Sequence, residues 1–382
     1  MNKFSLAIVP FFAISSLGAS SLKDAIINGK VSGAFQSYYF SRYKDSKKDN
    51  DILTLGLDIS YMSASYKGFG VKTTVQTATS PWVDEHSKIA RKNNMWGSGA
   101  QLSEAYLSYS FLKTIANIGR IYFSSPVMGA SASRINKESF EGISIINSDI
   151  SDTIVTLGFM NKFQARTDEN GKIGKFRKTF KSAASPWVFR LDNGAYTLAL
   201  KNKSIENLTL VAAYLDAVDA FKTAYFQVDY KISNYTISSQ YYSSKEEGKD
   251  RGYLLGFQGK VSFGALDLIA AFTSTGKDAD VIPGLGNGAD LAYTWSEVFA
   301  YQYEKDQNAY KLTAKYNINP NLYLGTSYLD ENGAGYNRAY TAIKSGYNFA
   351  GKLKGLNIVA AYEMGSKDAK DDELRIRLNY KF

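Results

Sequence analysis

The chain has 382 residues, a formal net charge of +9, no cysteine, one histidine and six prolines. Without cysteine there is no disulfide framework, and without a second histidine the usual zinc sites cannot form, so we expect no metal and no cofactor. Basic charge with many aromatic residues also suits nucleic-acid binding. The charges, however, are spread singly instead of clustered, which argues against a nucleic-acid partner.

The first residues predict export. Lys3 precedes a long uncharged apolar run, and small residues follow it at positions 18–20. This is the pattern of a secretory signal peptide, so we expect residues 1–20 to be removed and residues 21–382 to fold. A buried N-terminal helix is the alternative. No later segment has the roughly 18 uninterrupted apolar residues of a membrane helix.

The remaining chain alternates between apolar and polar residues. Every second residue is apolar or aromatic in "LTLGLDISY" (53–61), "YTLALKNK" (196–203), "AYFQVDYKI" (224–232), "AYKLTAKYNI" (309–318) and the final "ELRIRLNYKF" (373–382). A period of two is that of a β-strand with one apolar face. The pattern recurs along the whole chain and predicts an all-β protein.

The breaks between these segments alternate in length. We expect short turns near residues 66–68, 112–114, 150–152, 204–206, 232–234, 263–265, 318–320 and 351–355. Longer polar loops are expected at about 43–50, 80–100, 125–139, 165–193, 216–221, 244–251, 276–307, 331–337 and 366–370. Short turns at one end and long loops at the other are the typical strand connections of a bacterial outer-membrane barrel. We therefore predict a transmembrane antiparallel β-barrel of about 18 strands, with short periplasmic turns and long extracellular loops. A water-soluble sandwich also alternates, but its turns would not sort by length so regularly.

Lipid outside such a barrel sets the direction of basic side chains, because an arginine facing the bilayer midplane costs about 2–4 kcal/mol. We therefore expect the basic residues of the strands to face the lumen, among them Arg42, Lys162, Arg190, Lys201, Lys203, Lys311, Lys315, Arg375 and Arg377. Fewer acids share these faces, so the surplus charge would attract anions. For any single lysine, the simpler interpretation is that it only hydrates the lumen.

Four blocks together resemble the OprD-like family of outer-membrane porins. They are "SLKDAIINGKVSG" (21–33), "IGRIYFSSP…RINKESFEG…IIN" (118–147), "YTLALKNKSIENLTLVAAYLD" (196–216) and "PGLGNGADLAYTW" (283–295). The resemblance implies a narrow eyelet and a ladder of basic residues that passes small carboxylate-bearing solutes. It also implies that the third extracellular loop, about 125–139, folds inward to constrict the pore and carries Arg134.

Residues near this block carry the remaining expectations. Arg120 and Arg134 are expected at the eyelet, although Arg120 shares its strand face with Ile118, which leaves its direction open. Phe382 looks like the terminal aromatic residue by which the barrel-assembly machinery recognises its clients. The expected partners are small anionic or zwitterionic solutes, outer-membrane lipid and lipopolysaccharide, with a monomer or a homotrimer as the assembly.

Three functions stay open. The first is a porin of the bacterial outer membrane for passive, carboxylate-preferring diffusion of amino acids and small organic acids. The second is a structural barrel or adhesin whose loops bind partners and which conducts little. The third is a barrel hydrolase, which the single histidine, His86, disfavours because a Ser-His-acid site must be built around it. The segment "IPGLGNGAD" lacks the lysine and helix of a phosphate loop and is interpreted as an extracellular turn.

Overall fold

The computed structural model of the protein describes residues 18–44, 48–91, 97–168, 170–183, 187–298 and 301–382. The expected signal peptide lies mostly in residues 1–17, outside these ranges. The residues described contain two short α-helices, α1 (Leu22–Ile27) and α2 (Glu85–Arg91), together with the 3₁₀ turns η1 (Asn287–Ala289) and η2 (Gly351–Leu353). Within the described ranges, no helix has the length and hydropathy that crossing a membrane requires.

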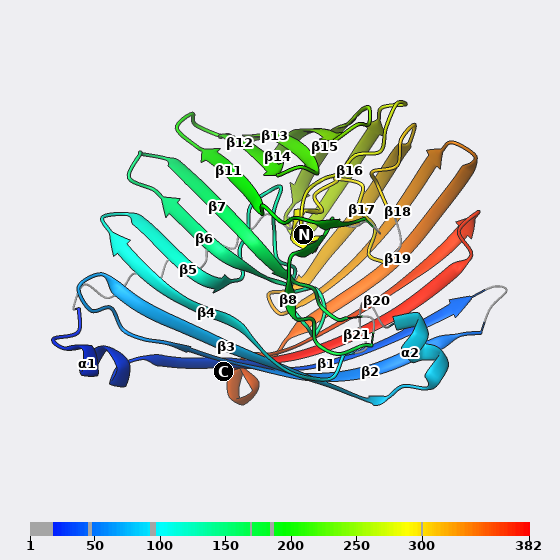
Figure 1. The fold of residues 1–382 in the computed structure, drawn as a ribbon. Helices are drawn as coiled ribbons and strands as arrows, with labels where there is room; N and C mark the ends of the chain where they lie inside the picture. The colour runs from blue at the N-terminus through cyan, green and yellow to red at the C-terminus, as the bar shows by residue number, and fades with distance from the viewer. Residues whose placement is uncertain (1–17, 45–47, 92–96, 169, 184–186, 299–300) are drawn as a thin grey trace.

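Eighteen of the described strands pair antiparallel and close into a barrel (Figure 1). They are β1 (Lys30–Lys44), β2 (Asn50–Met62), β3 (Phe69–Trp82), β4 (Gly99–Phe111), β5 (Thr114–Ile121), β6 (Ser139–Asn147), β7 (Thr153–Gln164), β11 (Ala195–Asn202), β12 (Leu208–Ala217), β13 (Phe221–Ile232), β14 (Tyr235–Glu246), β15 (Arg251–Phe263), β16 (Leu266–Thr275), β17 (Asn308–Asn319), β18 (Leu322–Gly333), β19 (Tyr336–Asn348), β20 (Leu356–Lys367) and β21 (Asp371–Lys381). Each pairs with the next along the chain, and β21 returns to β1 to close the ring. The predicted transmembrane barrel is confirmed.

The connections sort by barrel end as the sequence predicts. One end, called the turn end, has connections at 63–68, 112–113, 148–152, 203–207, 233–234, 264–265, 320–321 and 349–355. The other end, called the loop end, has connections at 45–49, 83–98, 122–138, 165–194, 218–220, 247–250, 276–307, 334–335 and 368–370. In Figure 1, α1 lies at the turn end and α2 at the loop end. Five expected long loops, at 45–49, 218–220, 247–250, 334–335 and 368–370, are as short as connections of the turn end.

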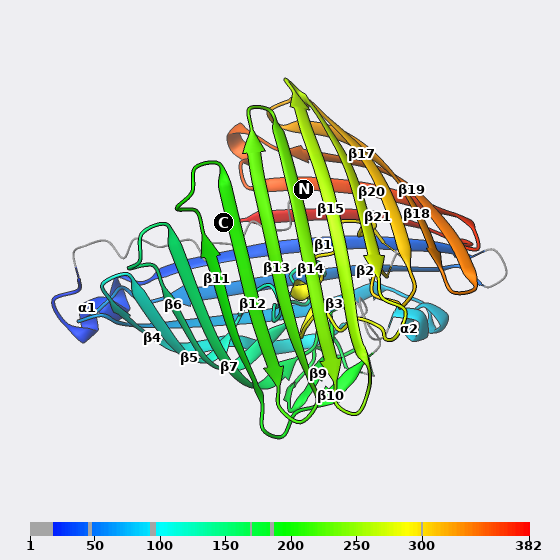
Figure 2. The ribbon, with the colours of Figure 1, turned by 90° about the horizontal axis from the view of Figure 1, so that it is seen from above.

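The loop from β7 to β11 has strands of its own. It contains β8 (Phe176–Arg177), which pairs with the end of β7, and a two-stranded ribbon of β9 (Thr179–Lys181) and β10 (Val188–Arg190). Figure 2 shows β11 to β15 side by side as one wall of the barrel, with β9 and β10 at its loop end.

The two faces of the wall differ as lipid and water require. On the outside, Tyr230, Phe257 and Leu312 keep 43%, 49% and 61% of their surface exposed. On the inside, polar residues such as Asp58 and Thr74 are buried. Because successive strand residues point to opposite faces, this arrangement follows directly from the period of two. A closed ring also leaves no unpaired sheet edge, which lipid would not tolerate.

Two long loops fold into the barrel and pair with each other. The loop 122–138 contacts the loop 276–307 through hydrogen bonds from the Gly129 N–H to the Leu285 carbonyl (2.9 Å) and from the Leu285 N–H to the Val127 carbonyl (3.0 Å). A Cβ on Gly286, which has φ +74°, would lie 2.3 Å from the Gly129 oxygen. Only glycine permits this approach. The "PGLGNG" segment, interpreted as an extracellular turn, is instead part of this buried loop pair; its glycines serve close packing.

The folded-in loops fill one side of the lumen. Their apolar residues pack with side chains from β6, β7 and β11 to β15 in one cluster that includes Phe140, Phe163, Phe180 and Tyr242. The inward side chains of β1 to β4 and β17 to β21 are mainly charged or polar. We call these two parts of the lumen the core side and the charged side. Two smaller apolar groups, around Phe40 and around Leu329, also lie on the charged side, but they contain far fewer residues than the cluster of the core side. We therefore expect an aqueous path to follow the charged side.

Candidate solute pathway

Arginines from three separate parts of the chain surround one buried carboxylate on the charged side. Arg42 of β1, Arg91 of α2 and Arg375 of β21 approach the Glu373 carboxylate to 2.6, 3.0 and 2.6 Å. The Glu373 side chain is fully buried. One carboxylate thus faces three guanidinium groups, and the surplus is positive.

An aromatic residue lies at the centre of a wider group of arginines. The guanidinium carbons of Arg134, Arg375 and Arg377 lie 5.3, 4.9 and 5.5 Å from the centre of the Phe40 ring. These distances suit cation–π contacts. The members of this group, here called the arginine cluster, are Arg42, Arg91, Arg134, Arg166, Arg375 and Arg377.

Arg377 is a member of the arginine cluster with a hydrogen-bond donor left unpaired in the described structure. Its Nε is buried and has no hydrogen-bond partner among the described residues. Its guanidinium carbon lies over Tyr38 and Phe40, at 5.6 and 5.5 Å from the ring centres. It follows Arg375 two residues along the strand, a rise of about 7 Å. Arg375 and Arg377 are therefore successive steps down the same inner wall.

Arg134 and Arg166 bring positive charge from the loops to the same place. Burial lowers the pKa of Arg134 well below its usual value, and the neighbouring cations Arg375, Arg166 and Arg377 lower it further. Arg166 donates hydrogen bonds to the hydroxyls of Ser131 and Ser133 at 2.8 and 3.0 Å. Mutual repulsion of buried cations has a direct consequence: an anion placed among them is stabilised.

The loop 276–307 is fixed to the charged wall by a second carboxylate. Glu363 of β20 accepts hydrogen bonds from the backbone N–H groups of Glu297 (3.0 Å) and Val298 (2.7 Å). The Glu297 side chain in turn contacts Lys344 of β19 at 2.8 Å. Burial raises the pKa of Glu297, but Lys344 and Lys311 outweigh this effect, so that its pKa lies below the usual value.

Two predicted pathway lysines lie on this part of the wall. Lys311 donates to the carbonyl of Trp295 in the loop 276–307. Lys315, four residues further along β17, lies 4.7 Å above the ring of Tyr323. Both face the charged side, and they continue the positive lining from the arginine cluster toward the turn end.

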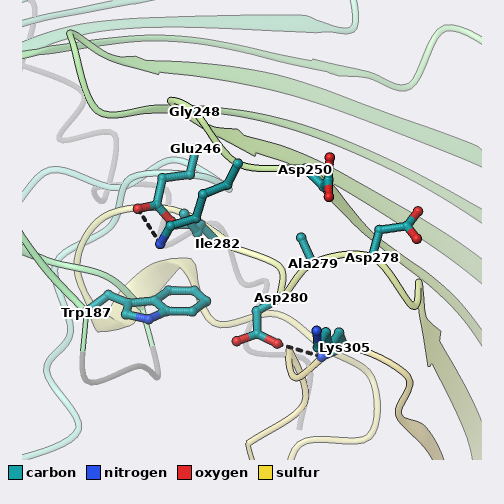
Figure 3. A pocket seen from close by; sticks show the side chains of 10 residues that line it. Trp187, Glu246, Gly248, Asp250, Asp278, Ala279, Asp280, Ile282 and Lys305 are labelled. Atoms are coloured by element: carbon teal, nitrogen blue, oxygen red, sulfur yellow. Dashed lines mark hydrogen bonds and ion pairs between the residues drawn. The ribbon is translucent and has the colours of Figure 1, made fainter.

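A pocket of about 380 Å³ opens at the loop end (Figure 3). Asp280 accepts a hydrogen bond from the Lys305 N–H at 2.8 Å, and Lys249 pairs with Glu246 at 2.8 Å. Trp187 forms one wall (Figure 3). The pocket's acids outnumber its lysines: Glu246, Asp250, Asp278 and Asp280 against Lys249 and Lys305. The loop-end opening of the barrel is therefore acidic on balance at this pocket, unlike the arginine cluster.

The other predicted pathway residues lie away from the cluster. Lys201 faces the lumen near the turn end of β11, and Lys203 follows in the adjoining turn. Arg190 lies on β10 in the loop ribbon, not on a barrel strand; it is 72% exposed and bonds Asp192 at 3.0 Å. None of the three contributes to the group around Phe40.

Arg120 lies on the outer face of the barrel. It shares its side of β5 with Ile118, which is 55% exposed on the lipid-facing wall. Arg120 pairs with Glu141 at 3.2 Å, and Lys162 contacts the same carboxylate. This differs from the expectations that Arg120 lies at the eyelet and that Lys162 faces the lumen. The cost of outward charge is small here because Glu141 pairs with both cations, which leaves one net positive charge, and because all three residues lie at the loop ends of their strands, away from the bilayer midplane.

The comparisons with known proteins agree with this geometry. Residues 50–382 match the family model described as outer membrane porin, OprD family. The chain belongs to the OprD family. No curated protein matches it. Among solved structures, it is similar to Pseudomonas aeruginosa OpdO (15% identity, TM-score 0.80, covering 94% of this chain and 98% of that one). It is also similar to Acinetobacter baumannii OccAB2 (19%, 0.80, 94% and 99%) and P. aeruginosa OccK9 (14%, 0.82, 94% and 99%). At these identities the structures support the fold alone.

Membership of the OprD family makes this chain an outer-membrane porin, a channel for small solutes.

Sequence reasoning missed two members of the arginine cluster, Arg91 and Arg166, because both come from polar loops without periodicity. His86 lies on α2, where its ring nitrogen is 3.1 Å from the Lys48 carbonyl. Within the described ranges, no group of three or more histidine, cysteine, aspartate or glutamate side chains is arranged to hold a metal ion.

Proposed function

We propose that this OprD porin prefers small carboxylate-bearing solutes and that the arginine cluster selects them. The single observation that carries the proposal is the surplus of guanidinium groups around Phe40 on the side of the lumen where the inward side chains are mainly charged or polar. Arginine holds a carboxylate through two parallel hydrogen bonds, and an enclosed low-dielectric wall strengthens the attraction.

The loops set where selection takes place. The loop 122–138 presents Arg134, and the loop 276–307 presents Glu297 opposite the same wall. A solute carboxylate would contact Arg134 and Arg375, move about 7 Å to Arg377, and then follow Lys315 toward the turn end. Each contact must be weak enough to release the solute. The loop 122–138 is thus the proposed constriction. Arg120, on the outer face, is left out of the path.

Uptake by proteoliposomes tests the proposal. In Arg377→Ala, we expect entry of a small carboxylate such as benzoate to fall about tenfold, because a hydrogen bond to a charged group contributes about 1.5 kcal/mol or more. Entry of a neutral solute such as glycerol should change little. Lys381→Ala is the matched control, since it removes one positive charge from the same strand at the exposed turn end. Equal losses for both solutes, or for both variants, would refute selection by the cluster.

The alternative function, a structural barrel or adhesin, predicts almost no conductance. We propose transport, without catalysis, as the activity.

We further propose that Phe382 is the assembly signal. Its backbone exchanges hydrogen bonds with Gly33 of β1 at the closure of the barrel, while its ring is 55% exposed. Phe382→Ala should then leave less folded barrel in the outer membrane; unchanged amounts would contradict this role.

A further inference from the structure

The short helix α1 lies at the turn end of the barrel, at the start of β1 and beside the β2–β3 hairpin (Figure 1). The Ala25 carbonyl accepts a hydrogen bond from the Ala64 N–H at 2.9 Å. This contact ties the helix to the β2–β3 hairpin.

Tyr61 shows on which side of the wall the helix lies. Tyr61 shares the outward face of β2 with Ile59, which is 46% exposed. The Tyr61 hydroxyl donates to the Ile26 carbonyl at the end of α1. A Cβ on Gly29 would lie 2.4 Å from the Tyr61 ring, so the ring covers the backbone at Gly29. The end of α1 and the start of β1 therefore contact an outward-facing side chain of the barrel wall.

The exposed face of α1 is apolar and continues the barrel's own lipid-facing surface. Ala25 is 2% exposed and faces the hairpin, whereas Leu22, Ile26 and Ile27 keep 64%, 54% and 66% of their surface exposed. Val31, which follows on the outward face of β1, is 67% exposed. Three large apolar side chains within one six-residue helix would be poorly placed in water.

We propose that α1 is an interfacial anchor, whose apolar face enters the leaflet of the outer membrane at the turn end. The occupant of this face is phospholipid. Two observations favour it over a protein partner: the face is continuous with the wall that lipid already covers, and Lys23 projects from the middle of the same exposed face. A lysine on an interfacial helix reaches the lipid phosphates while its stem stays in the apolar boundary. The proposal rests on the membrane barrel and not on the solute preference.

The absence of cysteine makes the test direct, since each single cysteine is the only thiol in the chain. Ile26→Cys, Leu312→Cys and Asp250→Cys would each be labelled with an environment-sensitive fluorophore in the full chain, reconstituted in phosphatidylethanolamine–phosphatidylglycerol vesicles. Leu312 on the wall is the lipid-exposed control, and Asp250 in the exposed β14–β15 connection is the water-exposed control. Only preparations that run as heat-modifiable barrels and conduct would be compared.

Vesicles with brominated acyl chains and added iodide report the two environments. We expect brominated lipid to quench the Ile26 label to within about twofold of the Leu312 label, and iodide to quench it severalfold less than the Asp250 label. Iodide quenching equal to that at Asp250, without quenching by lipid, would overturn the proposal. Protection from both quenchers would overturn it too, because protein would then cover the helix.

Discussion

Glu138 joins the two loops that fold into the barrel, and its removal should loosen the constriction. The carboxylate is 1% exposed and accepts hydrogen bonds from the N–H of Ser131 (3.0 Å), the N–H of Asn287 (2.8 Å) and the Asn287 side-chain amide. Arg166 lies 3.9 Å away. Ser131 belongs to the loop 122–138 and Asn287 to the loop 276–307, so one side chain connects both.

The size of the effect follows from these contacts. A hydrogen bond to a charged group contributes about 1.5–3 kcal/mol, and breaking a buried ion pair by removing one partner costs about 3–5 kcal/mol. We take about 3 kcal/mol as a conservative loss for Glu138→Ala. Since 1.4 kcal/mol corresponds to a factor of ten, the ratio of docked to undocked loops falls about a hundredfold. The closed ring of strands contains none of these bonds and should keep its stability.

Single-channel recording measures the result. We expect Glu138→Ala to increase open-channel conductance and current noise, and Glu138→Gln, which keeps one acceptor oxygen, to show a smaller increase. The temperature at which the barrel unfolds, followed by the shift of its band on a detergent gel, should stay the same. If Glu138→Ala has the same open-channel conductance and the same current noise as the wild type, this carboxylate does not hold the loop pair and the reasoning fails.

Three further predictions concern screening, packing and pH. Anion preference should weaken between about 0.1 M and 1 M salt, because the Debye length falls from about 10 Å to 3 Å; a constant reversal-potential ratio would point to contact geometry alone. Gly286→Ala should increase current noise, because its Cβ would meet the Gly129 oxygen at 2.3 Å. Gly248→Ala, with a similar φ of +71° and nothing within 4 Å, should not, and equal noise would refute the packing argument. The Glu297–Lys344 pair should hold its loop at neutral pH. Because the pKa of Glu297 is lowered from 4.5, the contribution is complete above that value and is lost as pH falls through the lower folded pKa. An identical acid response in Glu297→Gln would contradict this.

The strands could be predicted from the sequence because their environment repeats. Lipid on one side and water on the other impose a period of two, and in "ELRIRLNYKF" this period directs Arg375 and Arg377 to the lumen, where the structure has them. Arg42 follows the same rule on β1. The regular alternation of turns and loops similarly indicated the wiring of the whole barrel.

The loops could not be predicted in the same way. Arg91 and Arg166 reach the arginine cluster through contacts between segments far apart in the chain, such as the 3.0 Å contact of Arg91 with Glu373. No local pattern records such contacts. Arg120 shows the limit of the lumen rule: near a strand end, a paired arginine is tolerated on the outer face. The glycines of 283–288 indicated a turn, although their role is close packing between two backbones.

Reversal potential is the most direct measure of whether the arginine cluster governs permeation. The purified chain would be placed in a planar bilayer between potassium benzoate solutions of unequal concentration. The reversal potential should then take the sign of a benzoate-selective pore, and Arg375→Ala/Arg377→Ala should move it toward zero. A cation-selective potential in the wild type, or one that the double variant leaves unchanged, would contradict the account.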